Sequence, residues 1–263
     1  MAFFDRFKKK LPPRAAPEAK LLLAMPLFRN GDRYGLSAVI GHLRGHWGLD
    51  VSGHEGDDDA AVLTIGDNTV ALAYLPAPVP PLEIEALAPY AYNWPGVAAE
   101  LDGHSGHALL SVMGDAGSPL ARYRLLSMLL HSVLATSAAV GVYQGRQSLL
   151  LPRDQYLESA PGLAENKVPV DLWLYIGLQS TATGNSIYTV GMGEFGKPEL
   201  EVIDSKRELE ELYHFIVNIC AYVIVNDVAL RNGETLGYTA DQKIRITLSE
   251  GRFVEGETLK LAM

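Results

Sequence analysis

The sequence predicts an α+β fold with mixed, largely antiparallel sheets, packed helices and two pseudo-lobes. Short apolar runs of strand length recur along the chain, and several are paired across glycine-containing turns. Longer segments with apolar residues at helical spacing lie between them. Hydrophobic residues make up 48% of the 263 residues, enough for a sizeable core. We place a flexible basic segment and linker at 1–19, an N-terminal α+β lobe at 20–152 and a C-terminal α+β lobe at 153–263.

The N-terminal lobe alternates strands and helices. Gly66-Asp67-Asn68 separates two β-rich runs and predicts a hairpin. Ser118 and Pro119 provide a cap and a first-turn residue, so they predict the start of a long helix. The strands that flank this helix suit a crossover unit packed on a sheet. We predict strands over 21–28, 60–65, 69–75, 108–113 and 139–143, and helices over 36–47, 82–88 and 119–136.

The C-terminal lobe is also predicted to alternate strands and helices. A turn at 183–186 joins two runs into a probable hairpin. Ser205 with Glu208 three residues later forms a capping-box pattern, which predicts that a helix starts there and runs to about Val225. We predict strands over 171–179, 187–190, 199–203, 235–238, 244–248 and 258–261.

Charge and cysteine content exclude some classes of protein. The formal net charge is −9, which disfavours sequence-independent binding to nucleic acid. The single cysteine, Cys220, lies in an apolar helical run and reads as a small buried hydrophobe. We see no signal peptide and no uninterrupted apolar span, and we therefore expect a cytoplasmic protein. Phe3, Phe4 and Phe7 beside three lysines are compatible with membrane-surface contact through residues 1–10 or with a solvated terminus.

The sequence Gly191-Met192-Gly193-Glu194-Phe195-Gly196 matches the dinucleotide-binding pattern G-x-G-x-x-G. A phosphate site of that kind needs a helix directly after the loop. Pro198 and the alternation of charged and apolar residues after it predict extended backbone instead. We therefore expect the glycines to supply positive φ angles in an irregular loop, with no helix end to hold an anion.

Histidines are the second set that could carry chemistry. His42 and His46 are four residues apart on a predicted helix and share a face. The zinc-protease pattern H-E-x-x-H is absent, and a metal site needs about three or four converging ligands. We expect no metal centre and no cofactor, and we keep His42 and His46 as weak candidates. His54, His104 and His107 read as exposed or capping residues.

Loop aromatics suggest a binding surface. Tyr92 and Trp94 precede Pro95-Gly96, where they either anchor a partner or plug the edge of the core. No G-x-S-x-G nucleophile elbow occurs, so we identify no catalytic residue. The candidate binding residues are Tyr92, Trp94, Glu194, Phe195, Lys197 and Glu199.

Three segments in order resemble a known family. They are 139–143, then 191–201 with the core Phe195-Gly196-Lys197-Pro198-Glu199-Leu200-Glu201, then 232–237. This set is similar to the bacterial domain-of-unknown-function family 4261, over roughly 139–263. Asn232 stands where the family is expected to have an acidic residue. The resemblance implies no catalytic residue; members occur among bacterial toxin-neighbourhood and conflict genes, which implies an intracellular protein that binds another protein.

Two functions follow as expectations. The first is a non-enzymatic protein-binding protein of immunity or regulatory type, whose acidic surface would favour a basic partner. The alternative is a small-ligand or metal-binding enzyme that uses the Gly191–Glu201 loop.

Overall fold

The computed structural model describes residues 21–113, 117–237 and 243–263, and confirms the α+β class. Two compact units meet in the chain between Trp173 and Leu174. We predicted the division earlier, between residues 152 and 153. Helix α5 (Arg153–Ser159), which follows the predicted boundary, packs on α4 (Pro119–Thr136) and on strands β6 and β7 of the first unit. The basic segment predicted at 1–19, with its possible membrane contact, lies outside the described residues.

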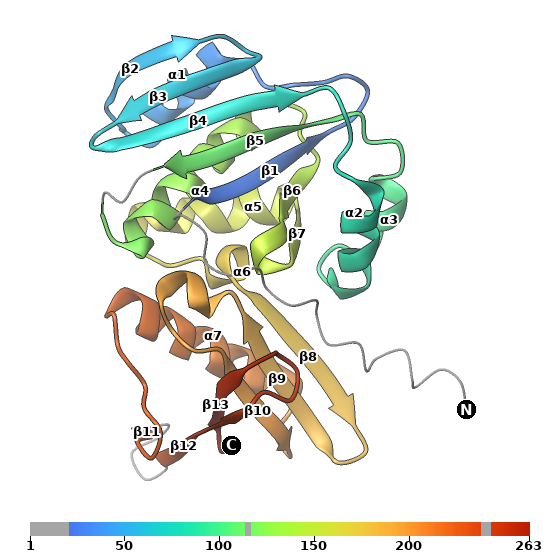
Figure 1. Cartoon of the computed structure of the whole chain (residues 1–263), viewed down its shortest axis with the longest axis vertical. Coiled ribbons are helices and arrows are strands. Elements are labelled where there is room, and N and C mark those ends of the chain that lie inside the picture. The colour runs from blue at the N-terminus through green and yellow to red at the C-terminus, as the bar shows by residue number, and fades with distance from the viewer. Residues whose placement is uncertain (1–20, 114–116, 238–242) are drawn as a thin grey trace. The chain divides into compact units, whose positions relative to one another are not determined.

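The first unit is built on a sheet with strand order β2-β3-β4-β5-β1-β6-β7, in which each neighbouring pair is antiparallel (Figure 1). The predicted hairpin is present, with β3 and β4 paired from one end to the other. Strands β2 and β7 were not predicted from the sequence. The strands are β1 (Leu22–Phe28), β2 (Val51–Gly56), β3 (Ala60–Ile65), β4 (Asn68–Leu75), β5 (Gly106–Met113), β6 (Gly141–Gln144) and β7 (Leu149–Pro152).

Helix α4 is the crossover connection that the sequence predicts. Strands β5 and β6 both pair antiparallel with β1, so they run parallel to each other and α4 joins them. The Ser118 hydroxyl accepts a hydrogen bond from the Ala121 amide at 3.2 Å, which confirms the predicted cap. Helix α1 (Leu36–Gly45) packs against α4, and this contact positions the site described below.

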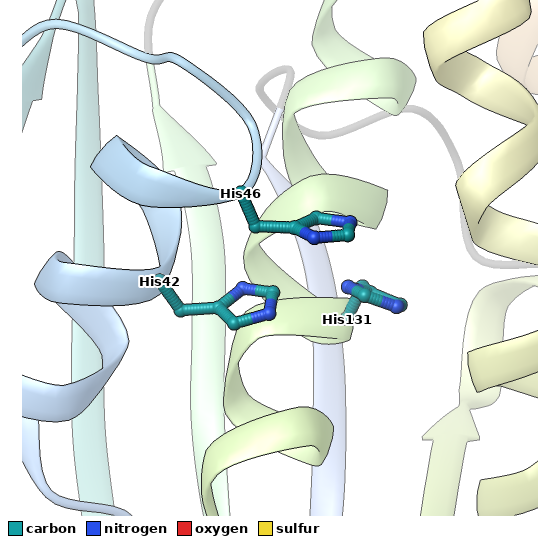
Figure 2. A group of neighbouring side chains, drawn as sticks. All are labelled: His42, His46 and His131. Carbon is teal, nitrogen blue, oxygen red and sulfur yellow. The ribbon is translucent and has the colours of Figure 1, made fainter.

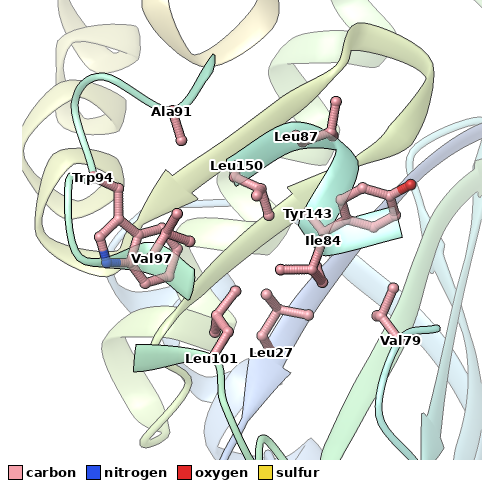
Figure 3. Close-up of a cluster of buried hydrophobic side chains, with 10 residues drawn as sticks. All are labelled: Leu27, Val79, Ile84, Leu87, Ala91, Trp94, Val97, Leu101, Tyr143 and Leu150. Carbon is pink, nitrogen blue, oxygen red and sulfur yellow. The ribbon is translucent and has the colours of Figure 1, made fainter. Parts of the chain in front are cut away.

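A cluster of buried apolar side chains joins the sheet to the segment between β4 and β5 (Figure 3). That segment contains α2 (Pro81–Leu87), the 3₁₀ turn η2 (Ala88–Tyr90) and α3 (Val97–Glu100). Trp94 packs so closely over Gly141 that a Cβ atom there would overlap its ring. The cluster comprises Leu27, Val79, Ile84, Leu87, Ala91, Trp94, Val97, Leu101, Tyr143 and Leu150.

The second unit has a sheet with strand order β11-β12-β13-β10-β9-β8, in which only the β10–β13 pair is parallel among the described strands. Helix α7 (Leu209–Val225) packs against β8 and β9. The strands are β8 (Tyr175–Thr181), β9 (Gly184–Val190), β10 (Leu200–Ser205), β11 (Thr235–Gly237), β12 (Lys243–Glu250) and β13 (Glu257–Leu261).

Of the local predictions after residue 153, one was wrong and another was right only in part, since β8 begins at Tyr175. The capping box fails because α7 begins at Leu209 with Glu208 at its N-cap, while the Ser205 hydroxyl accepts from the Arg207 amide in a local turn. The strand predicted over 171–179 begins as helix α6 (Val170–Trp173), since its first apolar residues are buried in the first unit. None of the described helices is both long and apolar enough to cross a bilayer.

Candidate metal centre

Three imidazoles meet where helices α1 and α4 pack together. His42 lies in the last turn of α1 and His46 is its C-cap residue, so helical spacing puts both on one face. His131 comes from the middle of α4. Their candidate ligand atoms all lie within 4.8 Å of one another. Figure 2 shows the rings of His42 and His46 extending from α1 toward the ring of His131 on α4. We call His42, His46 and His131 the histidine trio.

Burial keeps two members of the trio uncharged. His131 is 5% exposed, and burial with the neighbouring His46 and His42 lowers its pKa to about 4. Burial and His46 also lower the pKa of the half-buried His42. Both rings are therefore neutral near pH 7, which is the form that donates a lone pair to a metal ion.

A hydrogen bond to Ser132 fixes which nitrogen of His42 is free. The Ser132 hydroxyl donates its one hydrogen to the Met128 carbonyl at 2.8 Å. It therefore accepts from Nδ1–H of His42, which lies 3.0 Å away. The lone pair of His42 is then on Nε2. Metal-binding histidines commonly have such a partner on the second nitrogen, because it orients the ring and sets the tautomer.

His131 carries a buried polar atom without a hydrogen bond. Its Nδ1 has no partner among the described residues. A buried, unpartnered polar group costs about 1–3 kcal/mol, so it calls for a structural explanation. Coordination to a metal ion through Nδ1 would satisfy the atom. The buried nitrogen, the neutral rings and the fixed tautomer of His42 all fit a histidine-bound metal.

The rings are close enough for coordination after a small rearrangement. The centroids of His42 and His46 are 4.7 Å apart and stacked, and those of His46 and His131 are 5.1 Å apart. Bonds of 2.0–2.1 Å to one tetrahedral ion place nitrogens about 3.3 Å apart. His46 is exposed, so its ring is the one that can turn to direct a lone pair at the common centre.

The other histidines singled out in the sequence lie outside the trio. His104 and His107 are each 7% exposed, so of the two predicted roles, exposed or capping, the exposed one is wrong. His104 accepts from the Val79 amide at 2.9 Å, and Nδ1 of His107 is 2.8 Å from the Ala77 carbonyl oxygen. These bonds hold the chain between β4 and β5. His54 lies exposed on β2.

The G-x-G-x-x-G loop binds a carboxylate of its own chain. The Glu199 side chain accepts from the amides of Gly191, Met192 and Gly193 at 2.9, 3.2 and 3.3 Å, and from the Thr189 hydroxyl at 2.7 Å. Burial raises the pKa of Glu199, and these hydrogen bonds act against that rise. The amides that would bind a phosphate are thus already used.

The backbone around this loop behaves as predicted. Gly191 and Gly196 have φ angles of 120° and 69°. The 3₁₀ turn η5 covers only Met192–Phe195, and no helix begins at Lys197. The expectation of extended backbone without an anion-binding helix end is confirmed.

Glu201 is a second carboxylate enclosed by hydrogen bonds. Its side chain is fully buried and accepts from the Arg252 and Phe253 amides and from the Thr258 hydroxyl. Lys260 approaches it at 2.9 Å. Burial alone would raise the pKa of Glu201, but the bonds from Lys260 and the two amides outweigh it and lower the pKa. The carboxylate ties β10 to the loop before β13.

The part of the sequence that contains these two glutamates is the part that resembles a known protein family. Residues 188–262 match the family DUF4261, a domain of unknown function. The predicted resemblance is confirmed for this part of the chain; the 139–143 segment lies outside the match. No curated protein and no solved structure matches the chain. The DUF4261 region contains both enclosed glutamates, whereas the histidine trio precedes it in the first unit.

Other predicted binding residues of the DUF4261 region are largely engaged or covered. Lys197 pairs with Asp227 at 2.6 Å. Phe195 is 7% exposed and Glu194 is half-buried. Cys220 is buried in α7, as predicted, and burial raises the pKa of its thiol, so it is a poor nucleophile.

The two loop aromatics of the first unit differ in exposure. Trp94 is 4% exposed, and its indole donates to Glu100 at 2.9 Å, so it is a core residue. Tyr92 is 48% exposed. Binding of a partner through Tyr92 stays a prediction.

Sequence reasoning identified two members of the trio and missed the third. His131 was not among the candidate residues. The objection to a metal site was the shortage of converging ligands, and His131 removes it. A weak signal was available: a histidine in the middle of a predicted crossover helix is a polar residue in a position that is normally buried.

Proposed function

We propose that this chain binds a divalent transition-metal ion through His42, His46 and His131. The observation that carries the proposal is the convergence of three ligand atoms within 4.8 Å from two helices that are distant in sequence. Three is the usual number of protein ligands at a catalytic or exchangeable zinc site. The neutral state of His131 and the fixed tautomer of His42 support the same role.

The ligand type indicates the class of metal. Imidazole suits zinc, copper, nickel and cobalt, whereas magnesium and calcium select oxygen ligands. No carboxylate or thiol belongs to the trio. We therefore expect Zn²⁺ and its neighbours to bind, and Mg²⁺ and Ca²⁺ not to bind.

Calorimetric titration tests the proposal. Protein treated with a chelator and then dialysed is titrated with Zn²⁺, and separately with Mg²⁺. We expect one equivalent of Zn²⁺ to bind, and His131→Asn to weaken binding by more than about 100-fold, because loss of a direct ligand exceeds the 10–100-fold effect of outer partners.

A matched control is His214→Asn. His214 lies on α7, its side chain is 69% exposed, and it is in the other unit of the chain. Its replacement should leave Zn²⁺ binding unchanged. Equal affinity for the wild type and His131→Asn would exclude the trio as the metal site.

Protein binding is our second proposal, and exposed apolar side chains favour it. Leu82 on α2 is 77% exposed and Tyr92, shortly after η2, is 48% exposed. Such residues anchor interfaces, and the net charge of −9 would attract a basic partner. A partner recovered with the wild type and lost with Leu82→Ser/Tyr92→Ser would support this role. Recovery with both proteins would place the interface elsewhere.

A further inference from the structure

We propose that the metal ion held by the trio keeps a coordination position open to solvent, where water or hydroxide exchanges with a small anion. This inference rests on the proposed function, because it concerns the ligand sphere of that same ion. It separates an exchangeable site from a closed structural one, in which all four positions of a zinc ion are filled by the protein.

The count of available ligands leaves one position unfilled. In the described parts of the chain, no further histidine, cysteine, aspartate or glutamate joins His42, His46 and His131. The Ser132 hydroxyl, 3.0 Å from Nδ1 of His42, is unsuited to coordination, because it donates to the Met128 carbonyl and accepts from His42. A tetrahedral ion would therefore take its fourth ligand from solvent.

Exposure shows how a solvent ligand reaches the ion. Burial is graded across the trio: His131 is buried, His42 is half-buried and His46 is exposed. Here the side that His46 borders is open to water, and a small ligand can enter and leave there.

Charge decides what kind of ligand is preferred. Imidazole coordinates a metal ion in its uncharged form, so three such ligands leave the full double positive charge on the ion, and no carboxylate belongs to the trio. A bound metal ion is the largest local charge in such a site, and it favours anions and lowers the pKa of bound water to about 7. Hydroxide and small anions that bind a metal ion through a single atom at a time, such as azide, should therefore compete for the same position.

Cobalt provides a direct test, because the visible spectrum of bound Co²⁺ reports its ligands. The chelator-treated chain is loaded with Co²⁺, checked for one bound equivalent, and titrated with sodium azide at constant ionic strength. We expect a saturable change of the visible bands. His214→Asn should respond in the same way, and His131→Asn should show neither the initial spectrum nor the change.

The outcomes separate this inference from the proposed function. Failure of the wild type to retain Co²⁺ or Zn²⁺ would overturn the metal site itself. Retention of one equivalent of Co²⁺ with bands that azide leaves unchanged would overturn only the open position, since the ion would then be bound by a closed set of ligands.

Discussion

The glutamates of the DUF4261 region and the histidine trio of the first unit differ in how far their buried polar atoms are hydrogen-bonded. In the DUF4261 region, the carboxylates of Glu199 and Glu201 are surrounded by amide, hydroxyl and ammonium donors. In the first unit, His131 has a buried ring nitrogen with no partner among the described residues. A fully satisfied buried group holds a fold together, whereas an unsatisfied one is a candidate for an external ligand. The two glutamates are thus bound by donors of their own chain, and the candidate metal site lies in the first unit.

The largest effect should come from removing a satisfied group. Glu201→Ala leaves buried amides and Lys260 without their acceptor, and loss of one partner of a buried ion pair typically costs about 3–5 kcal/mol. We expect a clear fall in the urea midpoint of unfolding. The Zn²⁺ affinity of the folded variant should stay close to that of the wild type. A large loss of affinity would contradict the claim that Glu201 and the metal site are independent.

Binding of Zn²⁺ to the histidine trio should have the second-largest effect on the stability of the folded chain. A ligand present at 100 times its dissociation constant stabilises the folded chain by about 2.7 kcal/mol. Thermal unfolding with and without Zn²⁺ should show this gain in the wild type and lose it in His131→Asn. A gain of equal size in the variant would point to metal binding at another place.

Ser132→Ala should weaken the metal site without removing a ligand. The variant removes the hydrogen-bond acceptor of His42 Nδ1, so the tautomer of this ring is no longer fixed. Outer partners of this kind contribute about 10–100-fold in metal affinity. Ser137→Ala is a matched control. Ser137 is the C-cap residue of the same helix, and its hydroxyl donates to the Val133 carbonyl, as the Ser132 hydroxyl donates to the Met128 carbonyl. Zn²⁺ titration should distinguish the two variants, and equal affinities would remove the role assigned to Ser132.

Glu201 also predicts a pH dependence. Because its pKa is lower in the folded than in the unfolded chain, the unfolded state binds the proton more readily. Its stabilising contribution is complete above the ordinary glutamate pKa and is lost as the pH falls through the folded-state value. Urea midpoints measured from neutral to acidic pH should fall less in Glu201→Gln than in the wild type, and parallel curves would contradict this.

No effect is expected from nucleotides at the glycine-rich loop. The three amides that a pyrophosphate would use already bind Glu199. Differential scanning fluorimetry with NAD⁺ or ATP in the absence of divalent metal should leave the melting temperature unchanged. A concentration-dependent rise would show that a ligand displaces Glu199.

Local sequence patterns determined much of the fold. The Ser118–Pro119 start of α4, the hairpin around Gly66 and the extended backbone after Gly196 all depend on neighbours within a few residues, and each is present. The capping box at Ser205 failed because its hydroxyl had a competing local partner in the Arg207 amide.

Only the tertiary structure decided the site. His42 and His46 share a face by helical spacing alone, but His131 joins them through the packing of α1 on α4, which no local pattern encodes. The partner of the glycine-rich loop was likewise a residue of the same chain, since the fold of β9 back onto β10 brings Glu199 to those amides. Sequence spacing fixes which side chains share an element, whereas long-range packing fixes which elements bring their polar atoms together.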